Sequence, residues 1–240
     1  MAKNKKLPRL DKKQPVYSTF KIIMRMIFKR PQIINLAGDI EQKSIVVSNH
    51  SAKSGPPGLD LYYPVKTAKW GAYEMFGNYK SRKAYLRDIL YIKKCGYKPG
   101  FGTSFKSSVI AVFNPMVYKG MRMMPSYPDA RLLGTIRDSI QVLDSGLSIM
   151  IYPENSDNGY KEVLTEFHPG FVMLAMQYYR THGVDLPVYP VYYHTKKHVL
   201  VIGKPLYVQD MINEGLNRYQ IAERYCNAVN QLYFDHVKDK

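Results

Sequence analysis

The sequence is short of cysteine, of long apolar runs and of acidic residues. Only two of its 240 residues are cysteine, Cys95 and Cys226, and they stand far apart. This excludes a disulfide framework and a cysteine-based metal site, and favours a reducing compartment. No run of about 18 apolar residues occurs, which excludes a typical transmembrane helix. The Lys-rich start lacks the apolar segment of a secretory signal, so we expect none.

The shortage of acidic residues is uneven along the chain. The sequence has 35 Lys and Arg against 19 Asp and Glu, a net charge of +16. Residues 1–30 hold ten basic residues and one acid, and residues 61–125 hold twelve and two, whereas residues 126–240 hold eleven and thirteen. The first half is either a solvated basic surface or the site of an anionic partner. Such a partner is a membrane surface, a phosphorylated substrate, an acidic carrier protein or nucleic acid.

The N-terminal segment combines both basic and apolar character. Residues 1–15 form a basic tail, and residues 16–30 have the spacing of an amphipathic helix that Pro31 ends. The apolar face of this helix holds Phe20, Ile23, Met24, Ile27 and Phe28. The helix either packs on the core of the protein or lies in a membrane interface. The basic tail favours the membrane, because two weak signals together give stable attachment, so we expect a peripheral protein on the cytoplasmic face.

Predicted strands and helices alternate, which indicates an α/β fold with a central, mainly parallel sheet flanked by helices. We expect strands at residues 45–47, 65–70, 147–152, 186–193 and 198–203. We expect further helices at residues 61–64, 78–95, 129–144, 170–179 and 221–237, and an apolar stretch at 108–118 that Asn114-Pro115 interrupts. Residues 1–30 are predicted to be the tail and interface helix, and residues 31–240 a single α/β domain.

Two of the predicted strands end at a residue that can do chemistry. The run Ile45-Val46-Val47 stops at Ser48-Asn49-His50, and strand 147–152 stops at Pro153-Glu154. Ligands of parallel sheets bind outside the carboxyl ends of the strands. A His with a carboxylate on one ring nitrogen is a general base, and Asp60 is the first carboxylate after His50. The alternatives are an ordinary loop histidine and, for Glu154, an acid that stabilises a helix N-terminus.

The order of these blocks resembles the glycerolipid acyltransferases, in particular the 1-acylglycerol-3-phosphate acyltransferases. The matching blocks are N-H-loop-D at 49–60, Y-P-E at 152–154, F-x-x-G-F-x-x-L-A at 167–175 and V-Y-P-V at 188–191. They lie within residues 16–205, which is most of the chain. The resemblance implies the α/β fold already expected.

The resemblance also assigns roles to individual residues. It implies that His50 deprotonates the acceptor hydroxyl and that Asp60 orients His50. Glu154 is implied to hold the glycerol moiety or organise the site. Arg122 is the first candidate for binding the substrate phosphate and Arg131 the second, because a guanidinium can donate two parallel hydrogen bonds.

The chain departs from the family pattern in two places. Gly55 stands where the family has the Asp of its H-x-x-x-x-D motif, so we expect a five-residue insertion in a Gly- and Pro-rich loop that returns Asp60 to His50. Asn155 stands where the family has Gly, and Asn also tolerates left-handed backbone.

The implied reaction is acyl transfer from acyl-CoA or an acyl carrier protein to the free hydroxyl of a lysophospholipid. We expect no bound cofactor and no metal. Two other functions are consistent with the sequence: a catalytically inactive lipid-binding relative, and a nucleic-acid-binding protein that uses the Lys, Arg and Tyr of residues 73–97. No nucleic-acid motif occurs, so we expect no nucleic-acid partner.

Overall fold

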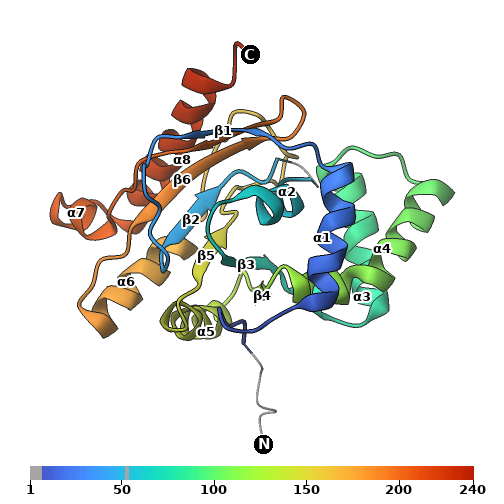
Figure 1. Cartoon of the computed structure of the whole chain (residues 1–240), viewed down its shortest axis with the longest axis horizontal. Coiled ribbons are helices and arrows are strands. Elements are labelled where there is room, and N and C mark those ends of the chain that lie inside the picture. Colours follow the sequence, from blue (N-terminus) through green and yellow to red (C-terminus); the bar gives the residue numbers. More distant parts are fainter. Residues whose placement is uncertain (1–6, 52–53) are drawn as a thin grey trace, which may run out of the picture.

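The computed structural model describes residues 7–51 and 54–240, and these build a seven-stranded sheet between layers of helices (Figure 1). The strand order is β1-β7-β6-β2-β5-β3-β4, and only the β6–β7 pair is antiparallel. The strands are β1 (Gln32–Asn35), β2 (Ile45–Ser48), β3 (Thr67–Ala72), β4 (Met123–Ser126), β5 (Ser148–Ile151), β6 (Val188–His194) and β7 (Val199–Ile202). The predicted α/β fold with a mainly parallel sheet is therefore confirmed.

Helices connect the strands. They are α1 (Pro15–Ile27), α2 (Gly55–Tyr62), α3 (Tyr79–Ala84), α4 (Phe101–Gly120), α5 (Leu132–Asp144), α6 (Gly170–His182), α7 (Val208–Asn213) and α8 (Arg218–His236). A short 3₁₀ turn, η1 (Tyr73–Phe76), and a π-helical segment, η2 (Tyr85–Lys94), flank α3. Within the described residues, no helix is both long and apolar enough to cross a bilayer.

The apolar β-branched run of β2 forms a strand that is buried on both faces, as in most parallel sheets. Ile45 and Val47 join the larger core cluster, which α5, α6 and α8 cover. Val46 points to the other face, where it packs with Leu59 of α2. Because β2 is the middle strand of the sheet, its end lies at the centre of one sheet edge.

Helices α1, α3 and α4 form a group beside the β3–β4 edge of the sheet (Figure 1). The sequence predicts an interruption at Asn114-Pro115, but α4 runs through it unbroken. Pro115 cannot donate the usual hydrogen bond to the carbonyl of Ala111. The Arg82 side chain replaces it, since its Nε donates to the Ala111 carbonyl oxygen at 2.9 Å.

Two other differences lie close to the site. Helix α2 begins at Gly55, not at residue 61, because prolines at the first helical positions start a helix. The predicted loop also includes residues 52–53, which lie outside the described residues, as do residues 1–6 of the predicted basic tail. Strands β1 and β4 and helix α7 were not predicted, since each is short.

Candidate active site

The carboxyl ends of β2 and β5 bring His50 and Glu154 together. These strands are parallel neighbours in which Val47 lies opposite Ile151. His50 and Glu154 each follow three residues later, so they reach the same edge of the sheet. The backbone N–H of His50 donates to Oε2 of Glu154 at 3.0 Å. Two residues about 100 positions apart in sequence therefore share one site.

Aromatic rings flank the His50 side chain. Tyr160 stacks on the imidazole with ring centroids 4.6 Å apart, and Tyr152 lies at 5.3 Å in a tilted arrangement. Burial raises the pKa of both phenols well above the ordinary value, so both stay protonated at neutral pH. Neither tyrosine was singled out from the sequence, although Tyr152 belongs to the Y-P-E block.

The backbone beside His50 is fixed by the preceding residue. Asn49 is buried, and its Nδ2 donates to the Tyr193 carbonyl oxygen at 3.0 Å while its Oδ1 accepts from the Tyr193 N–H at 2.8 Å. Ser51 then adopts a left-handed backbone with φ of 44°. Non-glycine residues rarely adopt such a φ, and strained backbone of this kind clusters at functional sites.

Glu154 is placed to hold the His50 backbone. Its side chain is 8% exposed and lies in a loop, paired with Phe167 as an isolated bridge, so it does not stabilise a helix N-terminus. Burial raises the pKa of its carboxyl, while N–H donors of His50 and Lys161 oppose that rise. The geometry gives Glu154 a positioning role.

Asp60 is held by basic residues of β3 and α1. Its Oδ1 lies 2.5 Å from Nζ of Lys69, and its Oδ2 lies 2.8 Å from Nζ of Lys21 and accepts the Tyr17 hydroxyl at 3.0 Å. Lys69 is completely buried. These contacts join Asp60 to β3 and α1, which the sequence does not predict. The pairing of Asp60 with His50 stays a prediction.

Gly55, the first residue of α2, packs closely on the site. A Cβ atom on Gly55 would lie 2.0 Å from the carbonyl oxygen of His50. Any side chain there would push the start of α2 away from His50, so this position requires glycine.

Arg122 lies next to this buried ion pair. Burial lowers the pKa of Lys69 and raises the pKa of Tyr17; the positive charge of Arg122 adds to the first shift and opposes the second, which places the guanidinium near both groups. Its Nε is buried without a hydrogen-bond partner among the described residues, and its backbone is left-handed with φ of 55°. Lys21, Lys69 and Arg122 thus bring three positive charges to the single Asp60 carboxylate in the described part of the chain. A cluster with excess positive charge and an unused guanidinium donor is suited to an anion.

Arg131, the second phosphate candidate, is already paired. Its guanidinium contacts the Asp129 carboxylate at 2.6 to 3.0 Å, and it lies over the rings of Tyr73 and Tyr127. The hydrogen bonds from Arg131 lower the pKa of Asp129 to about 2. Arg131 is exposed and provides a comparison for Arg122.

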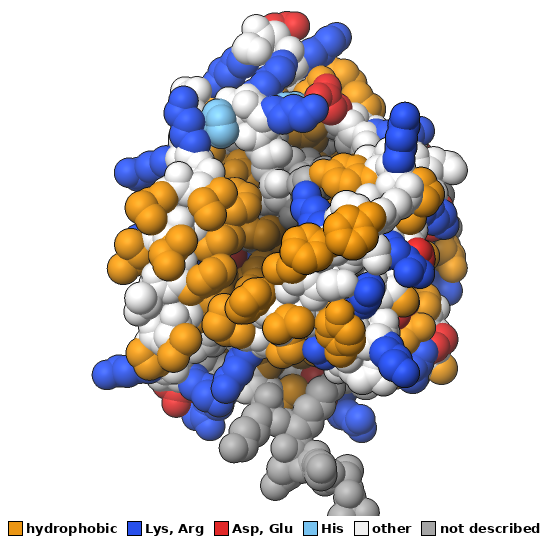
Figure 2. Space-filling model, turned by 90° about the vertical axis from the view of Figure 1, so that its right-hand side faces the viewer, with side chains coloured by type: hydrophobic (Ala, Val, Ile, Leu, Met, Phe, Trp, Pro, Cys, Tyr) orange, Lys and Arg blue, Asp and Glu red, His pale blue; other side chains and the backbone are white. Residues whose placement is uncertain are grey.

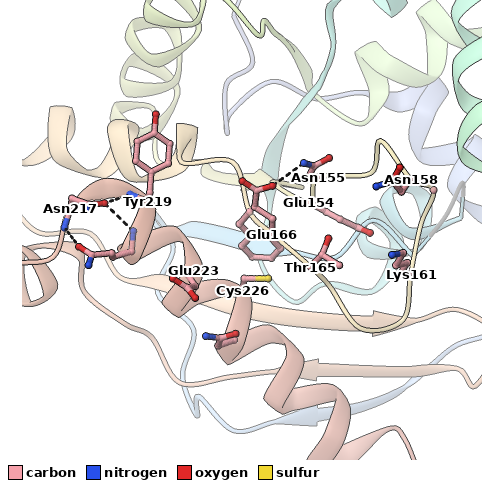
Figure 3. Close-up of a pocket in the computed structure, with 14 residues that line it drawn as sticks. Glu154, Asn155, Asn158, Lys161, Thr165, Glu166, Asn217, Tyr219, Glu223 and Cys226 are labelled. Carbon is pink, nitrogen blue, oxygen red and sulfur yellow. Dashed lines mark hydrogen bonds between the residues drawn. The ribbon is translucent and has the colours of Figure 1, made fainter.

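A cavity of 650 Å³ has Glu154 in its lining (Figure 3). Glu166 and Glu223 line it, and in Figure 3 Asn155 donates to Glu166, a bond of 2.9 Å. Three glutamates against one lysine make this cavity unfavourable for a phosphate. Cys226 also lines it, but burial raises the pKa of its thiol to about 11, so it is a poor nucleophile. Within residues 7–51 and 54–240, no group of His, Cys, Asp and Glu could hold a metal ion.

Replacing Glu154 tests its positioning role. Glu154→Ala removes the acceptor of the part-buried His50 N–H, which costs about 1–3 kcal/mol. If the catalytic position of His50 is destabilised by this free energy, turnover decreases about 5- to 150-fold. Glu154→Gln keeps an oxygen acceptor and is expected to retain most of the turnover lost in Glu154→Ala. Steady-state kinetics of both variants, with Glu166→Ala as the matched control, measure this; equal losses in Gln and Ala would contradict it.

Comparison with known proteins gives a structural match. No protein-family model matches the sequence, and no curated protein matches it. Among solved structures, the chain is similar to the 1-acyl-sn-glycerophosphate (LPA) acyltransferase PlsC from Thermotoga maritima. The TM-score is 0.53 at 15% sequence identity, over 91% of this chain and 78% of that chain. The chain therefore has the α/β fold of that acyltransferase structure, the fold that its sequence motifs led us to expect.

Proposed function

We propose that this protein is an acyltransferase that moves a fatty acyl group from an acyl thioester to the free hydroxyl of 1-acylglycerol 3-phosphate or a related lysophospholipid. The observation that carries this proposal is the joining of His50 and Glu154 at the carboxyl edge of a sheet whose fold matches PlsC. Such a site would serve phospholipid biosynthesis.

In the proposed reaction, His50 acts as the general base. Its imidazole takes the proton of the acceptor hydroxyl while that oxygen attacks the thioester carbonyl. The carbon–sulfur bond then breaks, the new ester forms, and His50 returns the proton to the thiolate. Tyr160 and Tyr152 limit the rotation of the imidazole. Helix α2 starts against the His50 carbonyl. Gly55 is the one residue of Gly55-Pro56-Pro57 with a backbone N–H, which can donate to the oxyanion.

The charges around the site support separate places for the two substrates. The cluster of Lys21, Lys69 and Arg122 suits the phosphate of the acceptor. The cavity beside Glu154 carries excess negative charge and amide groups, and suits an uncharged polar part of the donor. The uncharged thioester-bearing arm, which acyl-CoA and an acyl carrier protein share, fits this description, and no resident cofactor is needed.

The direct test measures thiol release from acyl-CoA and from an acyl carrier protein, each with 1-acylglycerol 3-phosphate. We expect release that depends on the acceptor, with formation of diacylglycerol 3-phosphate. No turnover with this acceptor, other lysophospholipids or glycerol 3-phosphate, from either donor, would contradict the proposal. The alternative would then be a non-enzymatic binder of anionic lipid or nucleic acid.

Arg122→Ala tests the phosphate site. A hydrogen bond to a charged group contributes about 1.5–3 kcal/mol, so we expect KM for 1-acylglycerol 3-phosphate to rise about 10- to 150-fold. KM for monoacylglycerol, which has no phosphate, should change little. Arg131→Ala is the matched control, since its guanidinium is held by Asp129. An equal rise for both acceptors would show that Arg122 supports the fold and does not bind phosphate.

A further inference from the structure

Residues 160–164, in the connection between β5 and α6, make two of the contacts that define the candidate site. The Tyr160 ring stacks on the His50 imidazole, and the backbone N–H of Lys161 donates to the Glu154 carboxylate. No helix or strand includes these five residues, so no backbone ladder sets the place of the Tyr160 ring. We call residues 160–164 the Tyr160 segment. Its position depends on side chains from other elements.

Glu162 ties the Tyr160 segment to β6 and α8. Its Oε1 lies 3.1 Å from Nε2 of His194, and its Oε2 accepts the Tyr233 hydroxyl at 2.8 Å. Nδ1 of His194 accepts the Lys197 N–H at 3.1 Å, so the neutral ring carries its proton on Nε2 and donates it to Glu162. Both oxygens of the carboxylate are therefore held by a donor.

Strand β6 also holds the histidine side of the stack. Asn49, next to the histidine, makes two hydrogen bonds to the backbone of Tyr193. Glu162 binds both neighbours of this tyrosine, because the Tyr192 hydroxyl donates to its carbonyl oxygen at 2.8 Å and His194 donates to its carboxylate. Three consecutive residues of β6 therefore set the imidazole and the stacked ring relative to each other.

Asn230 of α8 is a second anchor of the Tyr160 segment. Its Oδ1 accepts the Leu164 N–H at 2.8 Å, and its Nδ2 donates to the Leu164 carbonyl oxygen at 2.9 Å. Leu164 and Asn230 are buried, so this anchor belongs to the core. The Glu162 side chain, in contrast, is 59% exposed. Its removal leaves the core packing in place, and exposed charged pairs contribute little to stability.

Glu162 lies away from the places assigned to the two substrates. It does not line the cavity that includes Glu154, and its partners are in β6 and α8, not in the phosphate cluster around Arg122. Figure 2 looks onto the side that carries α1 and α4 and shows a hollow with hydrophobic side chains around it, whereas α8 lies on the other side of the molecule (Figure 1). The influence of Glu162 on the reaction therefore runs through the Tyr160 segment.

We infer that Glu162 is a positioning residue for the general base, which holds the Tyr160 ring against the His50 imidazole by tying the Tyr160 segment to β6 and α8. The inference rests on the proposed function for the role of His50. Without the carboxylate, the segment keeps its backbone bonds to Tyr192 and Asn230 but loses both bonds of the side chain, and the Tyr160 ring shifts. The imidazole then populates orientations in which it does not face the acceptor hydroxyl.

Steady-state kinetics of Glu162→Ala test the inference. A misplacement of about 1 Å can lower the rate about 100-fold, so we expect the turnover number to fall about 5- to 50-fold. KM for 1-acylglycerol 3-phosphate should stay near the native value, because the phosphate cluster remains. Glu162→Gln keeps an oxygen for His194 and an amide that can donate to Tyr233, so it should retain most of the turnover. The matched control is Asp157→Ala, an exposed acid of the same connection that pairs with Lys93, and it should keep native turnover.

Nuclear magnetic resonance measures the stack independently of turnover. The His50 signal is the one missing from the histidine Cε1–Hε1 spectrum of His50→Ala, and Tyr160→Leu gives its position without the stacked ring. We expect Glu162→Ala to move the His50 signal toward that position. Tyr233→Phe removes one of the two carboxylate bonds and keeps the ring, so it should move the signal part of the way. Glu162→Gln and Asp157→Ala should leave the signal in place.

Three results would overturn the inference. An unchanged His50 signal in Glu162→Ala would show that the glutamate does not hold the stack, and a shifted signal with native turnover would show that the stack does not support the base. Equal losses of turnover in Glu162→Ala and Asp157→Ala would show an unspecific effect on the connection. If Glu162→Ala does not fold, Tyr233→Phe gives the same comparison. If the native protein transfers no acyl group, the spectra still decide whether Glu162 holds Tyr160 on His50, so failure of the proposed function is recognised separately.

Discussion

His50→Ala is expected to lower the turnover number for acyl transfer by about 10²- to 10⁴-fold, the usual contribution of a general base. The variant removes the imidazole that lies beside Tyr152 and Tyr160. Its effect should fall on turnover, because the phosphate cluster around Arg122 remains. The measurement is thiol release at saturating donor and acceptor.

His168→Ala is the matched control for His50→Ala. His168 is exposed on the loop that returns from Glu154, and its hydrogen bond to Pro153 uses only the backbone N–H. It should keep native turnover. If His50→Ala retained more than about a tenth of native turnover while folded, His50 would not be the base. Thermal unfolding of both variants shows whether a loss of turnover comes from the missing base or from loss of structure.

Asp60→Asn is expected to decrease the free energy of unfolding by about 3–5 kcal/mol, because it leaves the buried ammonium of Lys69 without its carboxylate. Lys69 is 0% exposed and its Nζ lies 2.5 Å from Asp60. Lys69→Met in the Asp60→Asn background removes the unpaired charge and should recover a large part of the lost stability. Chemical denaturation of the two single variants and the double variant measures the coupling.

The pH dependence of the same variants gives a second test. Burial alone would raise the pKa of Asp60. The ammonium groups of Lys69 and Lys21 together lower this pKa by more than burial raises it, so the net pKa lies below the ordinary value. Stability from an acid with a lowered pKa is complete above the unfolded pKa of about 3.9 and is lost as pH falls through the folded value. The difference between native and Asp60→Asn should therefore be constant near neutral pH and shrink only below about pH 4. A difference that vanished near pH 6 would contradict an ion pair.

The same variants decide whether Asp60 also orients His50. Lys69→Met disturbs the ion pair but leaves the Asp60 carboxylate in place. If Asp60 holds the imidazole, Asp60→Asn should lower turnover far more than Lys69→Met does. Similar turnover in the two variants would leave Asp60 as a structural anchor of α1 and β3.

The sequence predicted the parts of the site that follow from strand periodicity. The end of the apolar run 45–47 locates His50, and the end of the predicted strand 147–152 locates Glu154; parallel pairing then brings them together. Strand periodicity carries no information about what each side chain contacts. For this reason Tyr160, which arrives from a loop, could not be predicted as the ring that stacks on His50.

The errors have identifiable physical causes. The Gly-Pro-Pro-Gly sequence after Ser54 was expected to be a loop, but it begins α2 because proline suits the first helical turn. Lys69 in a predicted apolar strand was a signal that a carboxylate must be buried beside it. That signal points to Asp60. The structure adds that α1 also contacts the Asp60 carboxylate, through Tyr17 and Lys21.

The hydrogen bond from Arg82 to the Ala111 carbonyl has a consequence for how this part of the chain folds. Because Pro115 leaves α4 one backbone bond short, the helix is complete only when α3 has docked against it. Helix α3 is itself only six residues long, too short to be stable alone. The two helices therefore form and open as one cooperative unit, and α4 reaches its final shape through a tertiary contact.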